Sequence, residues 1–410
     1  MGSSDLTRFP HGFLWGAATA AHQVEGNNTN SDWWAWEHSE PRRTELKRRG
    51  EDPALFLSGA ATDHWNRYEA DFDLLKDLNL NAYRFSVEWA RVEPEEGRFD
   101  EAVLAHYRAM LEALRQRQIK PIVTLHHQTH PRWFSERYGW HHRKSPDLFA
   151  RYAATVAGTL GDLIPWWITI NEPIMILLRH GPTESHNPVR VVKSLRHMVE
   201  AHRQAYAAIH GAHQSRESHR PSVSVANVVQ DWRMPRQLRP LRKLVRELDH
   251  YWLFDRLMAH LDYIGFNYYQ SYRFSLKGMH QIGNGITTDM GWQVYPEGLA
   301  HIATELNRQY AKPLLVTENG IADAADTRRA FFIIEHLRAL KRAMSRGANV
   351  LGYCYWSLLD NFEWEHGFAP RFGLVEVDYA TQERRVRDSA RIYAEIAKHN
   401  ALPPEVESSI

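Results

Sequence analysis

The stretch Trp166-Trp167-Ile168-Thr169-Ile170-Asn171-Glu172-Pro173 sets the pattern of the chain, because an apolar run ends there in polar residues and a proline. Short apolar runs that alternate with helical patterns predict the strands of a parallel sheet. We count eight such runs, at Phe13–Ala18, Ala82–Trp89, Pro121–His127, Trp166–Asn171, Val223–Val229, Tyr263–Tyr269, Leu314–Thr317 and Val350–Ser357. Eight βα units close a ring, so we predict a single (β/α)8 TIM barrel.

The segments between the runs have the spacing of amphipathic helices. In one of them the apolar residues fall on one helix face, at Val103, Leu104, Tyr107, Leu111 and Leu114. Asp100 precedes this segment and is a residue type that caps helix N-termini. The competing fold, an open doubly wound sheet, needs a glycine-rich phosphate turn after its first strand. Gly16-Ala17-Ala18-Thr19 is a poor substitute for that turn, which favours the barrel.

Composition and charge indicate one domain with a neutral, small partner. The 410 residues show no break in composition, so we expect one domain over residues 1–410, with frayed tails at about 1–8 and 403–410. Lys and Arg total 50 against 49 Asp and Glu, a formal charge of +1. This balance gives no electrostatic reason to expect nucleic acid or an anionic membrane as partner. The sequence leaves the oligomeric state open.

The N-terminus and the cysteine content bear on the compartment. Residues 1–10 contain no apolar run of the kind a signal peptide needs, and no stretch of about 18 apolar residues could span a bilayer. We therefore expect a cytoplasmic protein. The single cysteine, Cys354, cannot form an internal disulfide and lies in an apolar run, so we predict a buried, inert thiol.

Two predicted strands end in a carboxylate. The fourth ends in Ile170-Asn171-Glu172-Pro173 and the seventh in Val316-Thr317-Glu318-Asn319-Gly320. The active sites of such barrels lie at the carboxyl ends of the strands, and strands four and seven lie on opposite sides of an eight-stranded ring. We therefore expect Glu172 and Glu318 to face each other across the mouth of the barrel. Either carboxylate alone could equally cap a helix or form an ion pair; their combination favours catalysis.

A pair of facing carboxylates is what glycoside cleavage requires. One protonates the departing oxygen, and the other meets the developing positive charge on the sugar; their separation decides between retention and inversion. The sequence cannot supply that separation. A negative neighbour raises the pKa of the acid and so explains how a glutamate stays protonated near neutral pH. Asn171 could donate its amide to a substrate hydroxyl, and Arg84 could hold the second carboxylate ionised. The many aromatic residues, 15 Trp, 17 Tyr and 16 Phe, suit stacking against sugar rings.

These residues carry a resemblance to the family 1 glycoside hydrolases. It extends from Phe9-Pro10-His11-Gly12-Phe13-Leu14-Trp15-Gly16 to Arg371-Phe372-Gly373-Leu374-Val375-Glu376-Val377-Asp378-Tyr379. Asn171-Glu172-Pro173 resembles the acid/base motif of the family, and Thr317-Glu318-Asn319-Gly320 resembles its nucleophile motif. The extension Ile321-Ala322-Asp323 is especially similar to the archaeal-type β-glycosidases. The resemblance implies a retaining β-glycosidase that acts on terminal β-D-glucosyl residues, and on galactosyl or fucosyl residues, without metal or organic cofactor.

The resemblance also assigns the sugar-binding residues. Those that would hold the hydroxyls of the sugar are Gln23, His127, Asn171, Glu363 and Trp364. Trp356 would lie under its ring, while Tyr269 would hydrogen-bond the nucleophile with Asn267 in support. A carboxylate at Glu363 would repel a 6-phosphate, which favours a neutral sugar.

Three stretches depart from the family pattern. In His127-Gln128-Thr129-His130-Pro131 the family usually has an aromatic residue where this chain has Gln128, so we expect a wider or wetter sugar site. The stretch after Pro173 and the segment from Asp231 to Asp262 are shorter than the resemblance implies. Such trimming affects loops over the barrel mouth, so we expect the leaving-group side to be more open.

Two other function classes remain as alternatives. A carbohydrate-binding barrel with weak or impaired catalysis would show saturable binding with little turnover. A metal-dependent hydrolase would need His126, His127 and His130 as ligands, although neighbouring residues of a strand point to alternate faces. Activity that survives exhaustive chelation would exclude it.

Overall fold

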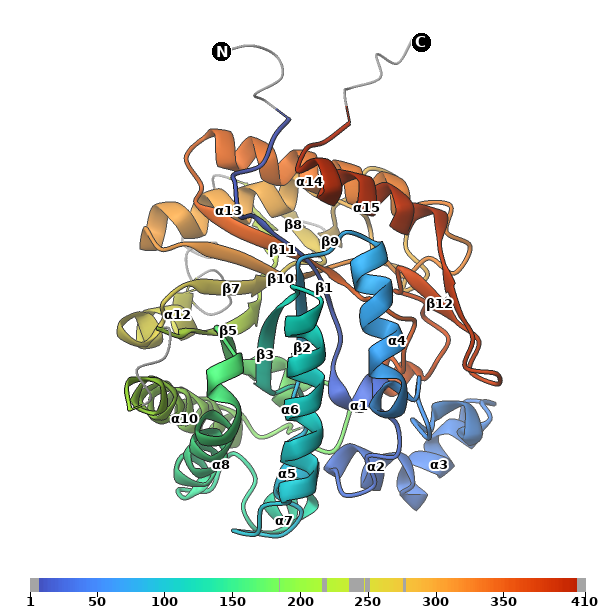
Figure 1. Ribbon diagram of the computed structural model, residues 1–410. Helices are drawn as coiled ribbons and strands as arrows, with labels where there is room; N and C mark the ends of the chain where they lie inside the picture. Colours follow the sequence, from blue (N-terminus) through green and yellow to red (C-terminus); the bar gives the residue numbers. More distant parts are fainter. Residues whose placement is uncertain are drawn as a thin grey trace.

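A closed barrel of eight parallel strands forms the centre of the protein (Figure 1). The structure is a computed structural model, and it describes residues 7–183, 185–215, 220–235, 247, 251–275 and 278–403. The barrel strands are β1 (Leu14–Ala18), β2 (Ala82–Ser86), β3 (Lys120–His126), β4 (Trp166–Asn171), β5 (Ser222–Val228), β7 (Ile264–Asn267), β10 (Leu314–Asn319) and β11 (Val350–Trp356). They follow the ring order β1-β11-β10-β7-β5-β4-β3-β2. The predicted barrel and its eight strands are confirmed.

Helices surround the barrel between consecutive strands (Figure 1). They are α1 (Ala21–Val24), α2 (Asp32–Glu37), α3 (Glu40–Arg48), α4 (His64–Asp77), α5 (Trp89–Val92), α6 (Glu101–Gln116), α7 (Arg132–Arg137), α8 (Ser145–Leu160), α9 (Pro173–Leu178), α10 (Pro188–Gln214), α12 (Trp252–Leu257), α13 (Pro296–Tyr310), α14 (Arg329–Ser345) and α15 (Asp388–His399). The predicted cap is present, because Asp100 accepts hydrogen bonds from the backbone N–H groups of Ala102 and Val103. Among the helices of the described residues, none has the length and apolar character needed to cross a bilayer.

Three strand boundaries differ from the prediction by two residues or more. The second run was predicted to extend to Trp89, but β2 ends at Ser86 because Glu88 caps a new helix, α5, that begins at Trp89. β7 ends at Asn267, two residues earlier than predicted. By contrast, β10 continues to Asn319 and therefore includes Glu318 within the strand. Apolar runs mark where a strand is buried, whereas backbone hydrogen bonds decide where it ends.

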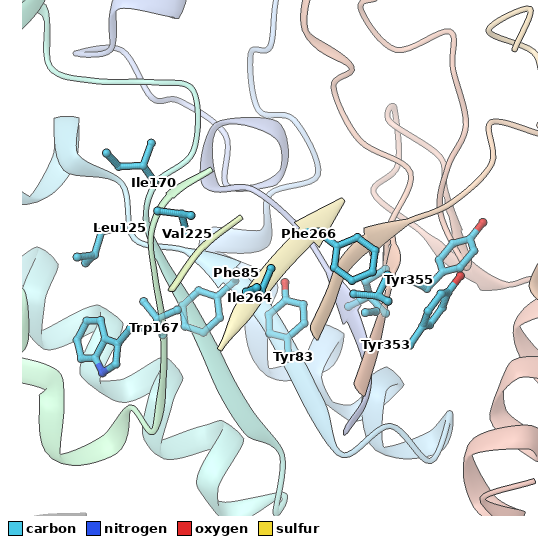
Figure 2. Packing of buried hydrophobic residues seen from close by; sticks show 14 of the residues in the cluster. Tyr83, Phe85, Leu125, Trp167, Ile170, Val225, Ile264, Phe266, Tyr353 and Tyr355 are labelled. Atoms are coloured by element: carbon cyan, nitrogen blue, oxygen red, sulfur yellow. The ribbon is translucent and has the colours of Figure 1, made fainter. Parts of the chain in front are cut away.

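The alternation of side chains along the strands builds two apolar layers. Outward-facing residues pack against the helices, among them Tyr83 and Phe85 of β2, Trp167 of β4 and Tyr353 of β11 (Figure 2). Inward-facing residues fill the barrel, at Leu14, Ala18, Ala82, Ile122, Ile168, Ala226, Leu315 and Cys354. Cys354 is fully buried, as predicted, and burial raises the pKa of its thiol to about 12. Polar residues that line a cavity are found at the carboxyl end of the barrel.

Two small sheets flank the barrel, and the sequence did not indicate either of them. One contains β6 (Asp231–Arg233), β8 (Ser271–Ser275) and β9 (Gly278–Gln281), and the other contains β12 (Val375–Val377) and β13 (Arg384–Val386). Each strand is three to five residues long, which is too short for a periodicity to stand out.

The two ends of the described chain meet at the amino end of β1. Arg8 forms an antiparallel bridge with Ala401, and the Leu402 N–H donates to the Thr7 carbonyl over 3.0 Å. Thr7 and Arg8, which we expected to fray, are held by these contacts. The rest of the predicted tails, residues 1–6 and 404–410, lies outside the described residues, as do residues 236–246 and 248–250 of the shortened segment.

Candidate active site

A cavity of about 110 Å³ opens at the carboxyl ends of the barrel strands. The predicted site residues that line it are His127, Asn171, Glu172, Tyr269, Glu318, Trp356, Glu363 and Trp364. The chain thus brings residues of β4, β10 and β11 and of the loops after β3, β4, β7 and β11 to one surface.

Glu172 lies where β4 passes into α9. Its backbone adopts the left-handed conformation, with φ of 46°, which few residues other than glycine take without strain. Its N–H donates to the Ala226 carbonyl of the neighbouring β5 over 2.7 Å, and this bond fixes the strained turn. The Asn267 amide donates to Glu172 Oε1 over 2.8 Å. The backbone turn and the hydrogen bond from Asn267 together hold the Glu172 carboxyl at the cavity wall.

Glu318 lies within β10 and has both carboxylate oxygens engaged. Arg84 Nη1 donates to Oε1 over 2.6 Å, and the Tyr269 hydroxyl donates to Oε2 over 2.8 Å. Both bonds stabilise the negative charge. Gly320 closes the turn behind it, and a Cβ there would lie only 1.7 Å from the Trp356 carbonyl oxygen. The Thr317-Glu318-Asn319-Gly320 motif therefore needs its glycine for the close approach of β11.

The strand order refines the expected placement of this pair. β5 and β7 lie between β4 and β10 on one side of the ring, and β3, β2, β1 and β11 lie between them on the other. We expected strands four and seven on opposite sides of the ring. They are three positions apart, one fewer than the four positions that would place them diametrically opposite. The carboxylates still share one cavity because both side chains point inward at its rim.

The two carboxylates have different electrostatic environments. Burial raises the pKa of Glu172 to about 7, and the negative charge of Glu318 adds to the increase. Glu318 instead contacts the guanidinium of Arg84. Of the two carboxyls, Glu172 thus has the environment that favours a proton, as expected of a general acid.

A hydrogen-bond network below the carboxylates fixes the state of His127. Asn171 Oδ1 accepts from Arg84 over 2.7 Å and from Asn267 over 3.2 Å, so its amide nitrogen must donate to His127 Nε2, 3.2 Å away. Burial lowers the pKa of His127 well below its ordinary value. The ring is therefore neutral, with its proton on Nδ1, which has no partner among the described residues.

Asn267 connects the two halves of the site. The resemblance implied that it supports Tyr269, but the hydrogen bonds of its amide nitrogen go to Glu172 and Asn171, while its oxygen accepts from the Thr317 hydroxyl over 2.6 Å. Burial raises the pKa of Tyr269 well above its ordinary value, so its hydroxyl remains a donor to Glu318.

Glu363 and two tryptophans form a further part of the cavity lining, and Gln23 lies behind them. Gln23 Nε2 donates to the Phe362 carbonyl over 2.7 Å and to Glu363 Oε2 over 3.3 Å. Gln23 is buried just behind the lining residues, and its Oε1 has no partner among the described residues. Burial raises the pKa of Glu363 to about 8. Trp356 and Trp364 stack on the ring of His127, with centroids 5.7 and 6.3 Å away.

The residues that depart from the family pattern divide between two places. Gln128 lines the cavity in the left-handed conformation, with φ of 70°, and its Nε2 is unpartnered in the described structure. His130 is buried outside the cavity, 3.3 Å from His126 and 3.3 Å from Asp32. Only one of the three histidines, His127, lines the cavity. Within the described ranges, no group of three or more His, Cys, Asp or Glu is arranged to hold a metal ion.

Several lining residues escaped the sequence analysis, namely Met175, Arg179, Val228, Gln230, Gln270, Trp292 and Phe372. Of these, Gln230, Gln270 and Trp292 lie in loops in which no apolar run or motif marks a position. Arg179 carried a usable signal, because it is a cation directly after the apolar run Ile174–Leu178.

Comparisons with known proteins agree with this geometry. The sequence matches the family model described as Glycosyl hydrolase family 1 over residues 6–255 and 245–402. It is 31% identical to Beta-glucosidase A of Acetivibrio thermocellus, over 96% of this chain and 99% of that protein. It is 29% identical to a Beta-galactosidase of Sulfolobus acidocaldarius, over 98% and 97% of the two chains.

Solved structures that are similar to this chain are also β-glycosidases. A beta-glycosidase from Pyrococcus horikoshii is similar with a TM-score of 0.84 and 34% identity, over 97% of each chain. The family model covers most of this chain, and the relatives match it from end to end. The chain therefore belongs to glycosyl hydrolase family 1, and it is an O-glycosyl hydrolase of the β-glycosidase type.

Proposed function

We propose that the protein is a retaining β-glycosidase in which Glu172 is the general acid/base and Glu318 is the nucleophile. The observation that carries this assignment is the contrast between the two carboxyls of one cavity. Glu318 contacts a guanidinium and a phenolic hydroxyl, whereas Glu172 is buried beside that negative charge. Environments of this kind favour an ionised group and a protonated one side by side.

The reaction then follows in two steps. Protonated Glu172 donates its proton to the glycosidic oxygen as the bond from that oxygen to the anomeric carbon breaks, and a Glu318 oxygen bonds to the same carbon. In the second step the Glu172 carboxylate takes a proton from water, the water oxygen attacks the anomeric carbon, and Glu318 leaves as a carboxylate. Two displacements retain the β configuration.

The remaining residues would hold the sugar. His127 offers an Nδ1 proton, Asn171, Glu363 and Trp364 line the cavity, and Trp356 would be the platform for one sugar ring. Gln23 lies behind this lining, within hydrogen-bond distance of Glu363. Substrates of this site are terminal, non-reducing β-D-glucosides, with galactosides and fucosides as further candidates. No step calls for a metal or an organic cofactor, and a cytoplasmic location is part of the proposal.

The stereochemical outcome tests the proposal directly. A panel of aryl β-D-glucoside, galactoside, fucoside and mannoside is incubated with the protein, and the first-formed anomer of the released sugar is followed by proton NMR. We expect the β-anomer to form first with every sugar that is turned over. An initial α-anomer would show a single displacement by water and would contradict the role of Glu318. Saturable binding without turnover would support a carbohydrate-binding barrel.

The pH dependence tests the role of Glu172. Its pKa of about 7 means that the protonated form, which is required of a general acid, is lost as the pH rises through 7. We expect kcat/KM for an aryl β-glucoside with a poor leaving group to fall above about pH 7, tenfold per pH unit. Glu172→Gln should remove this alkaline limb when an activated substrate is used. A limb that persists in that variant would assign the titration to another group, such as Glu363.

A further inference from the structure

Arg179 is a cavity residue that the proposed mechanism does not use. Arg179 directly follows α9, the six-residue helix that begins after Glu172, so the two residues lie at the two ends of one short helix. The Arg179 N–H donates to the Met175 carbonyl over 2.9 Å, and the Ser185 N–H donates back to the Leu177 carbonyl over 3.1 Å. These two bonds fix the backbone of the connection after β4, and the Arg179 side chain of this connection lines the cavity.

The guanidinium is placed by loose contacts that leave its donors available. Arg179 Nη1 lies 4.0 Å from Glu363 Oε1 and 3.7 Å from Glu365 Oε2, which is beyond hydrogen-bond distance. Its carbon Cζ lies 5.7 Å from the ring centroid of Trp364, so the aromatic face limits its orientation. In the described part of the chain its side chain makes no hydrogen bond, and Nε is buried without a partner.

The Arg179 side chain is 19% exposed and its charge faces Glu363 and Glu365, but its Nε donor is buried. A buried donor without a hydrogen-bond acceptor is unfavourable unless a ligand supplies one. The cavity beside Arg179 is lined by Glu363 and Trp364, two residues assigned to the sugar. A hydroxyl placed between Arg179 and Glu363 could accept from the guanidinium and donate to the carboxyl. The gap of 4.0 Å between the two groups is wide enough for both to turn toward such an oxygen.

We propose that Arg179 is a specificity-determining residue that donates a hydrogen bond to a hydroxyl of the sugar, the same hydroxyl that Glu363 binds. This inference rests on the proposed function, because it assumes that the cavity holds the sugar being cleaved. The positive charge of Arg179 would favour sugars that carry this hydroxyl over deoxy analogues that lack it.

The test removes the guanidinium and the hydroxyls in turn. Arg179→Met is assayed against aryl β-D-glucoside and its 3-, 4- and 6-deoxy analogues, with Glu363→Gln in parallel. We expect kcat/KM for the glucoside to fall roughly 10- to 100-fold in Arg179→Met, with a much smaller loss for one deoxy analogue. That analogue should also be the one least affected by Glu363→Gln. Lys193→Gln, which removes an exposed cation of α10, should leave all values unchanged.

Two outcomes would overturn the inference. An equal loss across all analogues would show that Arg179 has no contact with an individual hydroxyl. A loss that disappears as the pH is raised above 8 would show that Arg179 acts only by lowering the pKa of Glu363 through its positive charge. The proposed function fails on different evidence, namely wild-type activity in Glu318 variants. Thermal unfolding of Arg179→Met and rescue by Arg179→Lys separate lost contacts from misfolding.

Discussion

Glu318→Gly is expected to lower kcat for an aryl β-glucoside by roughly 10⁴- to 10⁶-fold, because losing the nucleophile of a covalent mechanism removes the main reaction path. The variant should fold, since Arg84 still has Asn171 Oδ1 and the Thr317 carbonyl as hydrogen-bond acceptors. Steady-state kinetics with a chromogenic glucoside and a thermal unfolding curve measure both quantities.

Added azide separates the loss of the nucleophile from general damage to the site. In Glu318→Gly the missing carboxylate leaves space for azide, which should restore turnover and yield the glycosyl azide of inverted, α configuration. Glu318→Gln is the matched control, because its amide fills the same space and should block the rescue. Wild-type rates in either variant, or a β-azide product from Glu318→Gly, would remove Glu318 from the nucleophile role.

Glu172→Ala is expected to affect substrates according to their leaving groups. Proton donation by a positioned acid contributes roughly 10²- to 10⁴-fold to a rate, so kcat/KM for an alkyl or methyl β-glucoside should fall by that amount. A dinitrophenyl glucoside leaves without a proton, and its kcat/KM should change far less. A plot of log kcat/KM against the pKa of the leaving group should therefore become much steeper in the variant.

Two controls accompany the Glu172→Ala experiment, namely rescue by added azide and the variant Glu172→Gln. Azide needs no general base, so it should speed the second step in Glu172→Ala and give the β-azide. Glu172→Gln keeps the shape of the side chain while losing the proton, and it should show the same leaving-group dependence. Equal losses for all leaving groups would argue that Glu172 has a structural role.

The strand ends could be predicted from the sequence because a barrel couples burial to position. Trp166 to Asn171 forms one buried strand, and Glu172 then falls at the carboxyl rim, where the polar residues of the fold gather. Glu318 followed in the same way, although β10 proved longer than its apolar run. A motif at the end of a barrel strand places its side chains at the carboxyl rim, which explains why the predicted residues share one cavity.

Other features could not be predicted, since they depend on tertiary contacts. Asn267 of β7 donates to Glu172, which follows β4 on the far side of β5, and nothing near either residue in the chain indicates that pairing. Gln128 and Glu172 adopt the left-handed backbone conformation although neither is glycine. The raised pKa of Glu172 likewise arises from burial and from Glu318, a neighbour far away in the sequence. Local patterns report which face is buried, but not which distant group lies against it.

The bridge between Arg8 and Ala401 has a practical consequence. It joins the two chain ends at the amino end of β1, whereas the cavity opens at the carboxyl ends of the strands. An affinity tag, a fusion partner or a linker to a solid support attached at either end would extend away from the sugar-binding mouth. The same proximity suits circular permutation, in which a short peptide connects the ends and new termini are opened in a surface loop.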